Sequence, residues 1–363
     1  MADKILTRGF EAIGLGALAA GCQVFPGCPT GPQDEFFKWL AEEFPKNGRH
    51  FVRTSSETSA INVAYGSGSA GGRVLVLVSS AGWGLIQESI SNMANGFVPV
   101  VIVLVQKGGP GVGSASHGQM DYFATTRDAG NGNYRTITLA PYTVQEMYDL
   151  TQLAFHLADK WRNPVIISTD VIGIHLQESI ETKILEYEPL PEKDWAVTGK
   201  GTHADGVRKY ISSGQGFIPT PLFSQYLEFL EGLNGKVVGM RKEEQRYESY
   251  SLDDAEVVMV AYGYSAGTCR EALKMARNQG IKAGLVRPIT LWPFPAAPIE
   301  EKAKKGAKFL VVEDGLGGLD EDVKMVVQGE CEVQVMSALD RKEPDETGMI
   351  YPEKVLERIK GLV

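Results

Sequence analysis

The sequence of 363 residues has no run of about 18 consecutive apolar residues, the least that a membrane-spanning helix requires. Its first apolar stretch, within MADKILTRGFEAIGLGALAAG, is interrupted by Glu11 and is not followed by a clear cleavage site. We therefore expect a strand or turn that leads into a helix there, and a cytoplasmic protein without a membrane span.

Cysteine and histidine are scarce, and neither is spaced as a metal ligand. No two of the four cysteines form a C-x-x-C motif, so we expect free thiols and no iron–sulfur cluster on this chain (Cys22, Cys28, Cys269 and Cys331). The five histidines show no ligand spacing, and only His117 lies in a glycine-rich segment. No metal site is predicted.

Positive charge is in deficit. The chain has 36 Lys and Arg against 45 Asp and Glu, a net charge of −9, and no long basic run. This balance argues against nucleic acid or an anionic membrane as the main partner. With 43% hydrophobic and 22% charged residues, the composition indicates a globular protein of two or possibly three domains.

Apolar runs alternate with stretches of helical period. The runs are almost continuous in Val, Ile and Leu, which is typical of strands buried on both faces of a parallel sheet (residues 74–80, 99–105, 164–170, 255–263, 282–288 and 308–314). Helical stretches lie between them, at 59–71, 143–161 and 265–280. The pattern predicts an α/β fold with helices that cover a parallel sheet.

This alternation breaks between about residues 186 and 250, where turn-forming residues predominate. The segment ends in the charged run RKEEQRYESYSLDD, which we expect to form a helix that leads to a linker. The prediction is therefore a first domain at 1–195, a connecting region at 196–250 and a second domain at 251–363.

Ligands bind at the carboxyl ends of the strands in such a sheet, so the segments after the apolar runs are the candidate sites. QKGGPGVGSASHG (106–118) offers backbone amides and a lysine, Lys107, to an anion, or else is a flexible surface loop. It matches neither the phosphate-loop motif nor G-x-G-x-x-G. After the run at 74–80, Trp83 opens a helix and either stacks on a ligand or packs in the core. Glu57 begins another helix, where a carboxylate is ordinary capping chemistry or a functional acid.

Five segments, in order, resemble the α subunits of 2-oxoacid:ferredoxin oxidoreductases, most closely the branched-chain (2-oxoisovalerate) type. They are GCPTGPQDE (27–35), ETSAIN (57–62), QKGGPGVG (106–113), DYFATTRDAGNGNYRTITLAP (121–141) and VRPITLWPFP (286–295). The resemblance covers nearly the whole chain. It implies a thiamine pyrimidine-binding domain followed by a domain like the transketolase C-terminal module, whose role is mainly structural.

The resemblance also implies the chemistry. Glu57 corresponds to the glutamate that hydrogen-bonds the aminopyrimidine of thiamine diphosphate, and so promotes deprotonation of thiazolium C2. Gly82 and Trp83 are the other expected cofactor contacts. A 2-oxoacid is then decarboxylated, coenzyme A takes the acyl group, and electrons pass to ferredoxin. A β subunit is expected to hold the diphosphate, Mg²⁺ and a [4Fe-4S] cluster, with γ and ferredoxin-like δ subunits in a dimer of heteromers.

The expected substrate residues depart from the family pattern. Gly31 stands where relatives have threonine, and Thr30 is displaced by one position. Lys107, followed by Gly108 and Gly109, replaces an arginine, although the two side chains are not interchangeable at a bidentate carboxylate site. The other departures are Cys28 for tyrosine, Ala81 for proline and Asn131 for histidine. We expect retained cofactor chemistry with a bulkier or differently shaped acid as substrate, an aromatic one for example.

A plain α/β binding protein is the weakest option, since the two-domain match would then be coincidence, and two stronger alternatives remain open at this point. One is a thiamine-enzyme fold that has lost catalysis and serves as an assembly or regulatory subunit, which the retained Glu57 argues against. The other is half of a thiamine-dependent transketolase or synthase, which would need neither ferredoxin nor iron.

Overall fold

The computed structural model describes residues 4–29, 31–199, 208–212, 223–340 and 348–363. Its first sheet has the strand order β12-β6-β7-β5-β4 and is parallel except for β12. A parallel pair, β2 and β3, continues it through a bridge between Val24 and Val74. The strands are β2 (Val24–Gly27), β3 (His50–Arg53), β4 (Leu75–Ser79), β5 (Val101–Gln106), β6 (Ile137–Leu139), β7 (Val165–Asp170) and β12 (Thr290–Trp292).

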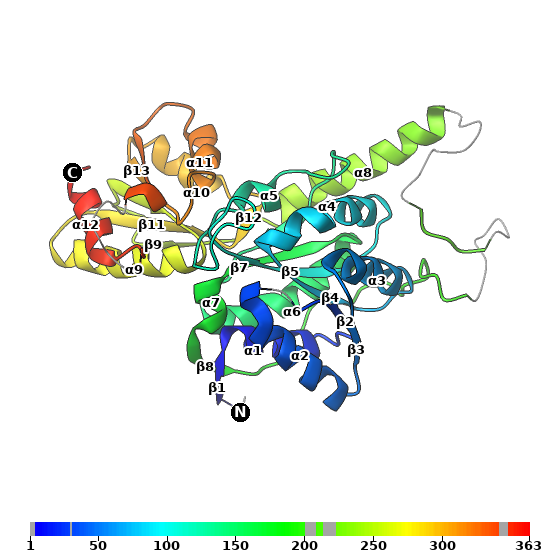
Figure 1. Ribbon diagram of the computed structural model, residues 1–363. Coiled ribbons are helices and arrows are strands. Elements are labelled where there is room, and N and C mark those ends of the chain that lie inside the picture. The colour runs from blue at the N-terminus through cyan, green and yellow to red at the C-terminus, as the bar shows by residue number, and fades with distance from the viewer. Residues whose placement is uncertain (1–3, 30, 200–207, 213–222, 341–347) are drawn as a thin grey trace.

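Helices cover both faces of this sheet (Figure 1). One face packs on α1 (Gly9–Ala19), α2 (Asp34–Lys46) and α6 (Val144–Trp161). The other packs on α3 (Glu57–Ser69) and α4 (Ser80–Asn95). Smaller elements are β1 (Lys4–Arg8), which pairs with β8 (Gln177–Glu181), and η1 (Gly31–Gln33), α5 (Tyr122–Thr126) and α7 (Val171–His175).

The second sheet has the order β14-β13-β10-β11-β9 and lies beside the first (Figure 1). Its strands are β9 (Tyr247–Tyr250), β10 (Val257–Val260), β11 (Ala283–Pro288), β13 (Lys308–Val312) and β14 (Val333–Met336). One face packs on α9 (Gly263–Asn278) and α12 (Pro352–Lys360), and the other on α10 (Ala297–Ala303) and α11 (Leu319–Val327). The chain also forms η2 (Ala338–Asp340) and a long helix, α8 (Phe223–Glu243), which projects from the body.

Strand β5 shows why the apolar runs are continuous. Val101, Val103 and Val105 belong to the core under α1 and α6, whereas Ile102 and Leu104 belong to the core under α3 and α4. Successive side chains of a strand point to opposite faces, so a strand covered on both faces needs apolar residues throughout. The predicted α/β fold with a parallel sheet is confirmed.

Two segments differ from the sequence-based expectation. The charged run at 241–254 was expected to be a helix, but α8 ends at Glu243 and β9 follows, paired antiparallel with β11. Glu244 ends the helix in a buried site, where it accepts a hydrogen bond from Trp161 Nε1 at 2.7 Å. In addition, β12 comes from the second-domain signature at 286–295, yet it pairs with β6 in the first sheet. The two sheets therefore share this motif.

Within the described ranges, no helix is both long enough and apolar enough to cross a membrane.

Candidate functional site

The carboxyl ends of β2, β3, β4 and β5 lie along one edge of the first sheet, since these strands run parallel. Cys28 follows β2, Glu57 lies shortly after β3, Ser80 follows β4 and Lys107 follows β5. This edge is where ligands bind in open α/β sheets. A residue predicted to contact the cofactor or substrate should therefore lie near this edge of the sheet.

Glu57 is the first residue of α3, whose N-cap, Ser56, accepts a hydrogen bond from Ser59 N at 3.1 Å. Its carboxylate lies over the start of α4. A Cβ atom added to Gly82 would be 3.0 Å from Glu57 Oε1 and 2.8 Å from Glu57 Cγ, and the second distance is shorter than real Cβ atoms show. Gly82 thus leaves the space that the carboxylate occupies. Burial, and then the charge of Glu57, raise the pKa of the Cys28 thiol, so Cys28 is a further neighbour.

Gly31 also lies near the start of α4. A Cβ on it would lie 3.9 Å from Ser79 Oγ, at the end of β4. Its φ of +71° is in the left-handed region, which favours glycine over the threonine of the family pattern. Thr30, the displaced threonine, is outside the described residues.

Lys107 is 5% exposed, and both its backbone and its ammonium group are hydrogen-bonded. Its backbone N donates to Ser80 Oγ at 3.0 Å, and its ammonium donates to the carbonyl of Val112 within its own loop. Gly108 and Gly109 follow it, and Gly108 N donates to Ser116 O at 3.2 Å. The structure thus brings together Gly31, Glu57, Gly82 and Lys107 with its loop, all around the first turn of α4.

Trp83 and Asn131 are placed differently. Trp83 packs in the core with Ile86 and Ile90, and its Nε1 donates to Ala124 O at 3.0 Å. Asn131 bonds Ser91 Oγ at 3.3 Å near the far end of α4. Nine residues separate Gly82 from Ser91, about 13 Å along a helix. Within this chain, Asn131 is not brought to Glu57.

Sequence reasoning singled out none of three polar residues at the site, although Gln106 opens the candidate glycine-rich segment. Ser80 donates to a carboxylate oxygen of Asp121, and Gln106 Oε1 accepts from Asp121 N at 3.1 Å. Burial raises the pKa of Asp121, whereas the Ser80 hydrogen bond and the charge of Lys107 lower it. Asp121 opens a motif that was recognised only as a family match, and its contact with Ser80 spans 41 residues. No local pattern reveals such a contact.

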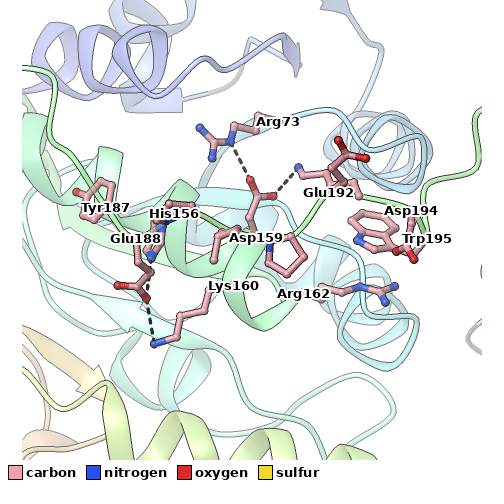
Figure 2. A pocket seen from close by; sticks show the side chains of 14 residues that line it. Arg73, His156, Asp159, Lys160, Arg162, Tyr187, Glu188, Glu192, Asp194 and Trp195 are labelled. Carbon is pink, nitrogen blue, oxygen red and sulfur yellow. Dashed lines mark hydrogen bonds and ion pairs between the residues drawn. The ribbon is translucent and has the colours of Figure 1, made fainter.

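A cavity of about 640 Å³ lies elsewhere, around the carboxyl end of α6 (Figure 2). Part of its charged lining is paired internally, since Asp159 lies 2.8 Å from Arg73 Nε and 2.6 Å from Lys193 Nζ. The end of α6 leads into the start of β7, so this cavity is at the opposite edge of the sheet from Glu57. Among the described residues, no cluster of three or more His, Cys, Asp or Glu is placed to hold a metal ion.

Comparison with known proteins decides the family. A model described as pyruvate flavodoxin/ferredoxin oxidoreductase, thiamine diP-binding, matches residues 15–217, and one for core domain II of pyruvate:ferredoxin oxidoreductase matches residues 255–346. Ketoisovalerate oxidoreductase subunit VorB of Methanothermobacter thermautotrophicus is 41% identical over 320 residues, or 88% of this chain and 89% of that protein. This chain belongs to the 2-oxoacid:ferredoxin oxidoreductase family.

Another named relative and two solved structures share less sequence with this chain. 2-Oxoglutarate synthase subunit KorA of Methanothermobacter marburgensis is 29% identical over the full length of both chains. In fold, the chain resembles 2-oxoglutarate:ferredoxin oxidoreductase from Magnetococcus marinus, with a TM-score of 0.82 at 22% identity. That match covers 99% of this chain but 65% of the solved one. An inactive split-gene transketolase tetramer gives a TM-score of 0.58 at 17% identity. Among these relatives, the branched-chain type shares the most identity.

Thiamine diphosphate is the cofactor of 2-oxoacid:ferredoxin oxidoreductases, and the site fits it. Glu57 and Gly82 both lie in the segment that matches the thiamine-binding family. The carboxylate is placed at the ligand-binding edge of the sheet, and the missing side chain at Gly82 leaves it room there. The predicted family and cofactor are confirmed, whereas the roles of individual residues stay predictions.

Proposed function

We propose that this chain is the α subunit of an enzyme that oxidatively decarboxylates a 2-oxoacid to an acyl-coenzyme A and passes the electrons to ferredoxin. The observation that carries the proposal is the placement of Glu57 against Gly82, next to the strand ends that bear Lys107 and Gly31. An acid at this edge can hold the aminopyrimidine ring by a hydrogen bond. When bound, thiamine diphosphate supplies the carbon nucleophile and accepts the electron pair released by decarboxylation.

The chain's own residues then have separate tasks. Glu57 holds the cofactor ring and fixes the proton on it, while Gly82 and Trp83 shape the wall behind. Lys107 supplies positive charge for the substrate carboxylate, on a loop whose backbone includes Gly108 and Gly109. To make this contact, the Lys107 ammonium must break its hydrogen bond to the carbonyl of Val112 and form one to the substrate carboxylate. Thr30, Gly31 and Asn131 are the remaining proposed substrate contacts, and Asn131 would need substrate or a partner chain that reaches the far end of α4.

Partner chains complete the proposal. A β subunit would hold the diphosphate, Mg²⁺ and a [4Fe-4S] cluster, with γ and ferredoxin-like δ subunits in a cytoplasmic dimer of heteromers. The supporting observation is that the relatives are named as subunits. Brown colour and stoichiometric iron in the complex that co-purifies with this chain would support it. A complex with thiamine diphosphate but without iron would instead favour a transketolase or synthase half.

The decisive experiment compares the wild-type complex with Glu57→Gln. The assay is 2-oxoacid-dependent and coenzyme A-dependent reduction of a viologen dye. Glu57→Gln should abolish turnover while the complex still assembles. The amide cannot share a proton with the nitrogen of the aminopyrimidine ring as the carboxyl group does. Glu88→Gln, an exposed acid on α4, is the matched control and should keep full activity. No turnover with any acid, in either protein, would favour a non-catalytic subunit.

We further propose that the substrate is bulkier than a branched-chain acid. Gly31 has no side chain, and Cys28, a neighbour of Glu57, is smaller than the tyrosine of the family pattern. A panel of branched, aromatic and dicarboxylic 2-oxoacids tests this. Cys28→Tyr should lower kcat/KM for the larger acids more than for 2-oxoisovalerate. A clear wild-type preference for 2-oxoisovalerate would contradict the proposal.

A further inference from the structure

The glycine loop that follows β5 closes on itself at a narrow neck. Gly108 N donates to Ser116 O at 3.2 Å, and Ser114 N donates to Gly108 O at 2.7 Å. A Cβ on Gly118 would lie 2.8 Å from Gly108 N and 2.9 Å from the carbonyl carbon of Lys107. The returning arm, which starts at His117, therefore packs directly on the backbone of Lys107. Because the two arms are in contact, we expect a shift of one arm to move the other.

The returning arm is bonded to the second domain. His117 Nδ1 lies 2.6 Å from Asp314 Oδ2, and the Tyr264 hydroxyl donates to the same carboxylate oxygen. Asp314 is 1% exposed and follows β13, whereas Tyr264 lies on α9. The contact spans 197 residues of sequence. Asp314, which pairs with His117, and Tyr264, whose ring lies edge-on to the His117 ring, thus both come from the second domain, for which the family resemblance implies a mainly structural role.

Gln119 makes the second attachment. Its backbone N donates to Asp314 O at 2.6 Å, and its side-chain Oε1 accepts from Asp314 N at 3.0 Å. The same Oε1 accepts from Ser265 Oγ at 2.6 Å, and Nε2 donates to Tyr262 O at 2.9 Å. All these partners belong to the second domain. Because Gln119 is buried, the bonds do not compete with water, and they fix the arm closely.

We propose that the second domain positions the glycine loop, with His117 and Asp314 as positioning residues for the contact between Lys107 and the substrate carboxylate. The connection consists of the hydrogen bonds of Asp314 to His117 and Gln119 and of the close packing of Gly118 on the backbone of Lys107. The loop beyond the neck is exposed from Pro110 to Ser116, so these attachments limit where Lys107 can lie. The inference rests on the proposed function, because it takes Lys107 as the substrate contact.

The test uses the complex purified with its natural partners and compares wild type, His117→Ala, His117→Asn and His156→Ala. His117→Ala should raise KM for the 2-oxoacid about tenfold or more while kcat falls less than about threefold, because carboxylate positioning rather than bond chemistry is lost. KM for coenzyme A should not change. His117→Asn retains a donor for Asp314 and should recover most of the affinity. His156 stacks on Tyr187 away from the loop and serves as the control.

Hydrogen exchange provides a readout that does not depend on turnover. Amides of Gly108 and Ser114 should exchange faster in His117→Ala than in wild type or His156→Ala. Unchanged exchange would overturn the proposal, and so would faster exchange with an unchanged KM for the 2-oxoacid. A wild-type complex without any turnover would instead overturn the proposed function, and exchange in the same samples would still show whether the second domain holds the loop.

Discussion

Arg287 Nη2 lies 2.6 Å from Glu146 Oε1, and Nη1 of the same guanidinium donates to Glu146 Oε2 at 3.1 Å. Arg287 is on β11 of the second sheet and Glu146 is in the first turn of α6, which covers the first sheet. The arginine side chain is fully buried, over the ring of Tyr142 and 3.1 Å from Glu248. Burial raises the pKa of Glu146, and the charge of Arg287 lowers it. The ion pair between Arg287 and Glu146 thus connects the two domains.

Arg287→Ala should lower the free energy of unfolding by about 3–5 kcal/mol, because it removes a fully buried guanidinium and leaves the half-buried Glu146 carboxylate without its ion-pair partner. The measurement is urea unfolding of the complex, followed by circular dichroism. Lys274→Ala, which removes an exposed ion pair with Glu271 in the same domain, is the control. It should change stability by less than about 1 kcal/mol. Equal effects of the two variants would show that the buried pair does not hold the domains.

Gly82→Ala should sharply reduce turnover. Its new methyl group would lie 2.8 Å from Glu57 Cγ and displace the carboxylate, and a misplacement of about 1 Å can lower the rate about a hundredfold. Gly84→Ala, two residues along the same helix, meets nothing within 4 Å and is the matched control. The dye assay should distinguish them although both favour the helix. Similar activities would argue that Glu57 does not need this space.

Glu313→Gln should stabilise the protein at pH 8 by about 1–3 kcal/mol and have little effect near pH 4. Glu313 is fully buried, and among the described residues its Oε1 has no hydrogen-bond partner. Burial raises its pKa from 4.5 to about 7, and the charge of Asp320 adds to the shift. The folded state therefore loses stability as pH rises from about 4.5 to about 7, whereas the amide stays neutral. Thermal unfolding from pH 4 to 8 checks this, with the exposed Glu330→Gln as control.

Trp83→Phe distinguishes packing from cofactor contact. Loss of the indole leaves Ala124 O without its 3.0 Å hydrogen bond and leaves a gap beside Ile86, which should cost about 1–3 kcal/mol of stability. If the residue only packs, the affinity for thiamine diphosphate, measured by reactivation of the cofactor-depleted complex, should stay within about twofold of wild type. A weaker affinity with unchanged stability would instead make Trp83 a cofactor contact.

Much of the fold was predictable because its signals are local. The continuous apolar runs, such as residues 99–105, are what a strand buried on both faces requires, and Ser56 followed by Glu57 marks a helix start. The position of candidate residues after strand ends followed from the parallel sheet. The family match then rested on five ordered motifs. These inferences use only neighbours in sequence.

The rest depends on contacts between distant segments. The pairing of β12 with the first sheet, the strand β9 and the bonds of Gln119 to Asp314 each join residues that no periodicity relates. The sequence by itself determined the α/β class, the family and the likeness of Glu57 to a catalytic acid. Only the tertiary structure decided that Gly82 leaves room for Glu57, that Asn131 lies at the far end of α4, and that Asp314 holds the glycine loop. Local propensity acts within a few residues, whereas packing and buried hydrogen bonds act wherever the folded chain brings groups together.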